Sequence, residues 1–103
     1  MSNPFHPRNS GTIAITVGTS TAATALPFPD SERWELQNNG SVPVFVEFGT
    51  SGSVTAVIPT GTAASYPILP GHSKVVRWRG ATHIATISGT ASQTLYVSAG
   101  DGN

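Results

Sequence analysis

Residues 32–48 have the sequence ERWELQNNGSVPVFVEF, and this stretch decides the fold class. Trp34 and Leu36 alternate with polar neighbours, and valines then alternate at positions 42, 44 and 46. A period of two places the apolar side chains of a strand on one face of a sheet. Two half-buried β-strands are therefore predicted here.

The interval 38–40 (NNG) predicts a hairpin that joins these strands. A two-residue type I′ turn within it would place Trp34 opposite Phe45 and turn the valines to the wrong face. A three-residue loop instead pairs Trp34 with Val44 and gives Gly40 a left-handed conformation. Because burial sets the register, we expect the second arrangement. Its outer face would carry Arg33, Glu35, Pro43, Phe45 and Glu47.

Short strands are also expected elsewhere, because no window has the spacing of an amphipathic helix. Their patterns lie at 13–17, 21–26, 53–59, 66–71, 74–80, 82–88 and 93–98. About eight short antiparallel strands with regular turn signals indicate an all-β, single-domain β-sandwich or jelly-roll-like fold. An immunoglobulin-like topology stays open as an alternative. The expected core consists of Trp34, Leu36, Val44, Val46, Val76 and Trp78.

The composition limits the classes of function. Of the 103 residues about 10% are charged, the formal net charge is zero, and there is no cysteine. This balance argues against a broad nucleic-acid-binding surface. The missing cysteines exclude disulfides and thiol chemistry. We expect no membrane span, because no apolar run is long enough, and no secretory signal, because the first residues lack a hydrophobic core region.

The side chains that could carry chemistry are scattered. His6, His72 and His83 lack the spacing of paired metal ligands. Glu35 and Glu47 share the expected outer face, where two carboxylates could act as in a glycosidase. No loop cluster surrounds them, so we interpret them as surface ion-pairing residues. We predict no catalytic residue, cofactor or metal, and a protein that is not an enzyme.

The most positive part of the sequence is RWR at 77–79. Its arginines could grip a phosphate or the carboxylates of a partner. Alternatively, Trp78 lies in the core while Arg77 and Arg79 extend along the solvent face. We favour the second interpretation.

The first ten residues, MSNPFHPRNS, have no strand periodicity. Pro4 and Pro7 restrict the free chain, so ordering this leader on a partner loses little entropy. We divide the chain into an extended N-terminal arm at 1–10, preferred over a disordered tail, and a β-sandwich domain at 11–103. The candidates for a partner interface are Phe5, His6, Pro7, Arg8, Arg33, Phe45, Arg77 and Arg79.

Three segments carry a resemblance to a known class of proteins: SVPVFVEFG at 41–49, PILPGHSKVVRWRGATHIATISG at 67–89 and TLYVSAGDG at 94–102. They resemble small virion-associated proteins of tailed bacteriophages. In that class a strand ends in F-V-x-F-G, a Leu-Pro-Gly turn leads to a further strand, and Thr-His-Ile-Ala follows a glycine. The matching residues belong to turns and strands, and the first forty positions contribute little.

The resemblance implies a capsid decoration, or cement, protein. Such a protein would sit on the capsid surface of the virion as a homo-oligomer or in many copies, bind the major capsid protein or another virion protein and stabilise the head, without contacting nucleic acid or membrane. A neck, tail or head-fibre-base component is an alternative position. A glycan-binding module is a further alternative, with Phe45, Tyr66 or Tyr96 as aromatic platforms.

Overall fold

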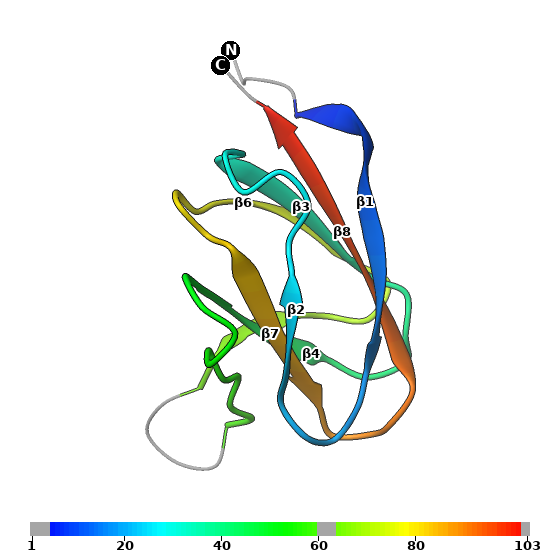
Figure 1. The fold of residues 1–103 in the computed structure, drawn as a ribbon. Coiled ribbons are helices and arrows are strands. Elements are labelled where there is room, and N and C mark those ends of the chain that lie inside the picture. Colours follow the sequence, from blue (N-terminus) through cyan, green and yellow to red (C-terminus); the bar gives the residue numbers. More distant parts are fainter. Residues whose placement is uncertain (1–4, 60–63, 102–103) are drawn as a thin grey trace.

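The computed structural model describes residues 5–59 and 64–101, and this part of the chain is all β (Figure 1). It contains no helix that is long and apolar enough to cross a bilayer. The strands are β1 (His6–Val17), β2 (Ala22–Ala25), β3 (Arg33–Asn38), β4 (Val44–Gly49), β5 (Tyr66–Ile68), β6 (Ser73–Arg77), β7 (His83–Ser88) and β8 (Gln93–Asp101).

The strands form two four-stranded sheets that pack face to face. Sheet A has the order β1-β8-β3-β6, and sheet B has the order β2-β7-β4-β5. The hydrogen-bonded pairs include β1 with β8, β2 with β7, β3 with β6 and β4 with β5, all antiparallel. The chain is thus one long hairpin, folded at the β4–β5 connection and then rolled, which is a jelly roll. The predicted fold class is confirmed, and the immunoglobulin-like alternative is not.

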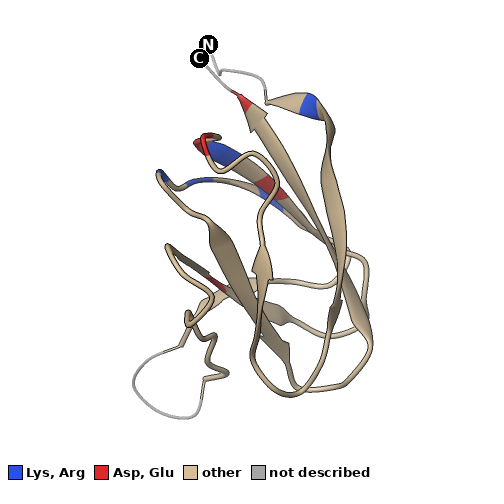
Figure 2. Cartoon of the chain, in the orientation of Figure 1, with Lys and Arg blue, Asp and Glu red and all other residues tan. Residues whose placement is uncertain are grey.

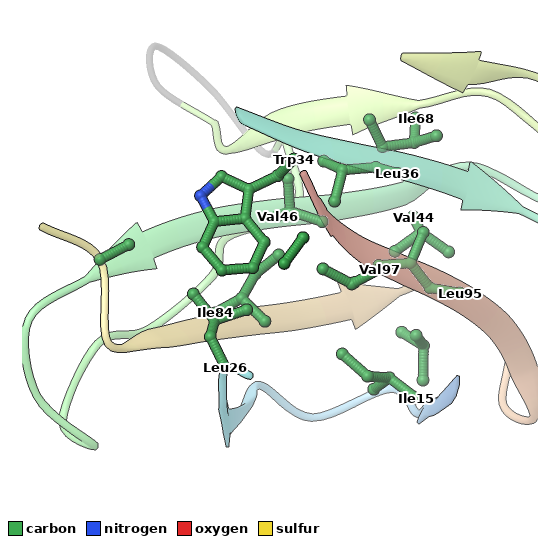
Figure 3. Packing of buried hydrophobic residues seen from close by; sticks show 13 residues of the cluster. Ile15, Leu26, Trp34, Leu36, Val44, Val46, Ile68, Ile84, Leu95 and Val97 are labelled. Carbon is green, nitrogen blue, oxygen red and sulfur yellow. The ribbon is translucent and has the colours of Figure 1, made fainter. Parts of the chain in front are cut away.

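The core lies between the two sheets and follows the alternation in the sequence (Figure 3). Trp34, Leu36 and Val44 are fully buried and Val46 is 2% exposed, as predicted. The buried cluster is completed by Ile15, Val17, Leu26, Ile68, Ala81, Ile84, Leu95, Val97 and Ala99. Val76 is only partly buried against this cluster.

The predicted hairpin between β3 and β4 is wrong. β3 pairs with β6 and β8, whereas β4 pairs with β5 and β7, so residues 39–43 cross from one sheet to the other. Trp34 and Val44 do face the same interior, but from opposite sheets. Burial alone could not distinguish these arrangements, because both satisfy the alternation. Gly40 also lacks the predicted left-handed φ; among the described glycines this conformation occurs at Gly71 and Gly80.

The strand predicted at 53–59 is absent, and this segment lies over the outer face of sheet B. Val54 packs where a side chain on Gly49 would be. The amide of Ala56 donates to the Thr21 hydroxyl at 2.7 Å, and Ala56 is buried. The apolar residues alternate here because the segment packs against a sheet face, although it does not pair with a strand.

Candidate protein interface at the end that carries the termini

Residues 6–10 of the leader belong to sheet A, whereas residues 1–4 lie outside the described part of the chain. β1 begins at His6, and its first residues pair with the last residues of β8, His6 with Asp101 and Pro7 with Gly100. The Phe5 ring covers the α-carbon of Gly100, where no side chain could fit. The first strand therefore begins earlier than the predicted pattern at 13–17. The register shifts between Pro7 and Thr12, and this irregularity hides the strand period from the sequence.

Arg8 ties three segments together at this end. Its guanidinium donates to both carboxylate oxygens of Asp101, at 2.8 and 3.1 Å, and to Asp30 at 3.0 Å. It also lies over the Phe28 ring, 5.3 Å from the centroid. The hydrogen bonds from Arg8 hold the pKa of Asp101 below its ordinary value. Arg8 is thus a structural cross-link between β1, the 26–32 loop and β8.

Ser31 holds the 26–32 loop against β8. Its buried hydroxyl donates to the Gly100 carbonyl at 2.6 Å and accepts from the Gly100 amide at 3.1 Å. The turn before it places Phe28 at φ 52°, between two prolines. A bulky residue in this region is strained. The loop therefore holds an aromatic side chain, 38% exposed, in an unfavourable backbone conformation.

Glu32 is the last residue of this loop and joins it to the RWR segment. One carboxylate oxygen of Glu32 accepts from Arg79 at 3.1 Å and from Arg77 at 3.2 Å. These hydrogen bonds lower the pKa of Glu32, and the bond from Arg79 has the larger effect. The Trp78 amide donates to the Glu32 carbonyl at 2.9 Å. The two arginines therefore have a carboxylate of their own chain between them.

Trp78 is on the surface and not in the core as predicted. It is 38% exposed and stacks on Phe48, with the ring centroids 6.0 Å apart. The physical reason is that β6 ends at Arg77, so the alternation that points Val76 inward no longer applies one residue past the ladder. The interpretation of RWR as a core tryptophan between two solvated arginines is therefore wrong.

The structure brings most of the predicted interface residues together. Pro7 and Arg33 both pair with Gly100, and Arg33 pairs on its other side with Arg77, so these residues form one row across sheet A. Phe5, His6, Arg8 and Arg79 lie around that row. Phe45 is the exception, because it lies in sheet B, between Pro67 and Ile87.

Other sequence candidates lie apart. Glu35 is in sheet A and Glu47 is in sheet B. The prediction that they share one face is therefore wrong. Glu47 accepts instead from the Ser65 hydroxyl at 2.7 Å. His83 hydrogen bonds to Thr82 at 2.8 Å. No set of three potential metal-ligating side chains was found in the described part of the chain.

The sequence reasoning missed Phe28, Asp30 and Glu32. The signal that could have found them is PFPDSE at 27–32, in which an aromatic residue stands between two prolines beside two acidic residues. Figure 2 shows that the charged residues gather toward the end where both termini lie. The connections at the opposite end, 18–21, 39–43, 69–72 and 89–92, contain no Asp, Glu, Lys or Arg.

Acid is expected to weaken the fold through Glu32 and Asp101. Both carboxyl groups have a lower pKa in the folded protein, so the folded state binds fewer protons than the unfolded state. Their contribution is complete above the unfolded pKa, near 4, and is lost as the pH falls through the depressed values. Urea midpoints should be flat from pH 7 to about 5 and fall below about 4. Glu32→Gln should reduce this fall, whereas an unchanged fall in Glu32→Gln with a reduced fall in Glu35→Gln would contradict the assignment.

No protein-family model matches the chain, and no curated protein matches it. Among solved structures, it is similar to a chain from work reporting that "Bacillus endospore appendages form a novel family of disulfide-linked pili", with a TM-score of 0.52 and 18% identity over 96% of this chain and 88% of that one. It is also similar to PirA, with a TM-score of 0.52 and 14% identity over 88% of this chain and 94% of that one. At these identities the likeness shows the fold. The disulfide linkage named for the Bacillus pili has no counterpart here, because this chain has no cysteine.

Proposed function

We propose that this protein is a non-enzymatic structural module that attaches in many copies to a larger protein assembly, through the end of the sandwich that carries its termini. The resemblance to virion-associated proteins supports a bacteriophage particle as the assembly and the major capsid protein as the partner. The likeness to a pilus chain supports the use of this fold in repetitive structures. We propose capsid decoration in preference to a neck or tail position.

The observation that carries the proposal is the composition of this end. Phe28 and Trp78 are each 38% exposed; Arg8 lies over the Phe28 ring, and Arg77 and Arg79 flank Trp78 in the sequence. Aromatic residues and arginine are enriched at the energetic centres of protein interfaces. The left-handed φ of Phe28 adds to this, because strained residues gather at functional surfaces.

Glu32 holds Arg77 and Arg79 in place but leaves most of their N–H donors without a partner among the described residues. Arg79 donates to Glu32 through Nε and Arg77 through one terminal nitrogen. A guanidinium has five N–H donors, so each can still bind a carboxylate of the partner. Because Glu32 already restricts both arginine side chains, they lose less conformational entropy when a partner binds.

Attachment tests the proposal. Purified particles lacking this protein would be titrated with it, and bound copies counted after sedimentation. Trp78→Ala and Phe28→Ala are each expected to weaken binding about 30-fold, which corresponds to the roughly 2 kcal/mol of an interface hot spot. Tyr66→Ala removes an aromatic side chain that is 45% exposed in sheet B and should bind normally.

The number of copies per particle distinguishes capsid decoration from a neck or tail position. Capsid decoration requires a copy number comparable with that of the major capsid protein, whereas a neck or tail position requires far fewer copies. Equal occupancy by Trp78→Ala, Phe28→Ala and the unmodified protein across the titration would show that this end is not the attachment surface.

A further inference from the structure

A hollow of about 290 Å³ opens on the outer face of sheet A. It lies where β3 ends and β6 begins, at the opposite end of the sandwich from the termini. Its lining consists of Gln37, Asn38, Asn39, Gly71, His72, Ser73 and Tyr96. The volume is near the lower limit of small-molecule sites and suits a ligand the size of one sugar ring.

Three of the lining residues form a row across the sheet. Gln37 of β3 pairs with Tyr96 of β8 on one side and with Ser73 of β6 on the other. The half-buried Tyr96 supplies an aromatic ring, and the exposed Gln37 and Ser73 supply an amide and a hydroxyl beside it. Asn39 and His72 add a second amide and an imidazole. The surface combines one apolar ring with several neutral polar groups.

These polar groups are available to a ligand. In the parts of the chain that the structure covers, the side chains of Gln37, Asn39, His72, Ser73 and Tyr96 make no hydrogen bond to another protein group. Amides and hydroxyls both donate and accept, as sugar hydroxyls do. No Asp, Glu, Lys or Arg lines the hollow, so nothing there favours a charged ligand.

The backbone of the hollow is already fixed. The Asn38 amide donates to the His72 carbonyl at 3.0 Å, and the Gly71 amide donates to the Asn38 carbonyl at 2.9 Å. A further bond runs from the His72 amide to the Leu69 carbonyl at 3.1 Å, and Gly71 takes a φ of +75° that the turn requires. Binding would therefore order little additional chain.

We propose that this hollow binds one ring of a neutral carbohydrate, with the Tyr96 ring against the apolar face of the sugar and with Gln37, Asn39 and Ser73 exchanging hydrogen bonds with its hydroxyls. Of the three aromatic residues considered as glycan platforms, only Tyr96 lines this hollow, since Phe45 and Tyr66 lie in sheet B. The site does not depend on attachment to an assembly. A module held by the end that carries the termini would leave this end free.

The test uses the isolated protein and two-dimensional amide NMR. Glucose, galactose, mannose and N-acetylglucosamine would each be added up to roughly 50 mM, enough to saturate a site with a millimolar Kd, with glucuronate as a charged comparison. At least one neutral sugar is expected to shift the amides of residues 37–39, 71–73 and 95–97 in a saturable manner. Tyr96→Ala should weaken that binding about tenfold, the loss expected for one stacked ring.

Three further variants separate binding from folding. Tyr66→Ala should bind the sugar as the unmodified protein does, and its spectrum should stay dispersed. If Tyr96→Ala fails to fold, Gln37→Ala and Ser73→Ala, which change exposed side chains, take its place. The proposal is overturned if no neutral sugar shifts these amides, if only glucuronate does, or if the folded Tyr96→Ala protein, or the two variants that replace it, bind the sugar with unchanged affinity. None of these results would affect the attachment of the protein to particles.

Discussion

Replacing Trp34 by alanine is expected to remove a large part of the stability of this domain. Trp34 is fully buried between the sheets, beside Val46 and Ile84 and with its ring 6.2 Å from that of Phe48 (Figure 3). Truncating a buried tryptophan leaves a cavity that a two-layer core cannot close, at a cost of about 3–5 kcal/mol. The total stability of such a domain is about 5–15 kcal/mol.

The other tryptophan provides the matched control. Trp78 is 38% exposed and stacks on Phe48, so Trp78→Ala should cost about 1 kcal/mol, the value of one aromatic pair. The chain has two tryptophans, so each variant keeps one fluorophore for following urea unfolding. Equal losses from Trp34→Ala and Trp78→Ala would contradict the assignment of one to the core and the other to the surface.

A third variant uses an unusual feature of Trp34. Its Nε1 atom is buried, and the structure shows no hydrogen-bond partner for it among the described residues. Trp34→Phe removes this unpaired donor together with part of the ring, so the gain offsets part of the cavity cost. The loss should be about 1–2 kcal/mol, well below that of the alanine variant.

The alternation in the sequence was sufficient to predict most of the strands and part of the core. Trp34, Leu36, Val44 and Val46 were assigned to the interior because period two fixes which face of a strand is buried. It does not fix which sheet a strand joins. In a sandwich, neighbours in the sequence can face each other across the core instead of lying side by side, and β3 and β4 do so.

The candidate interface at the end with the termini was only partly predictable. Its arginines and the leader were chosen from residue type, but the residues that they contact could not be predicted from the sequence. Arg8 meets Asp101 across 93 positions of sequence, and this contact depends on the first and last strands being adjacent. The partial exposure of Trp78 depends on where β6 ends, and strand ends are the least certain feature of a sequence pattern.

Replacing Asn38 by alanine is expected to destabilise the segment in which the chain crosses from one sheet to the other. Asn38 ends β3 and is 2% exposed. Its side-chain amide donates to the carbonyls of Val42 and Ile68, at 2.8 Å each, and its side-chain oxygen accepts from the Gly40 amide at 2.8 Å. One side chain thus satisfies three backbone groups where the chain leaves sheet A for sheet B.

Alanine would leave those groups unpaired in a largely buried place. A hydrogen bond contributes about 1 kcal/mol and an orphaned buried group costs about 1–3 kcal/mol, so Asn38→Ala should lose about 2–4 kcal/mol in urea unfolding. Asn38→Asp should lose at least as much at neutral pH, because it removes the donors and points a carboxylate at two carbonyls. The control is Asn39→Ala, whose exposed side chain bonds to no other residue in the described chain, with a change within about 0.5 kcal/mol. A loss in Asn39→Ala equal to that in Asn38→Ala would mean that the general shape of the loop, and not the three hydrogen bonds of Asn38, sets the crossing between sheets.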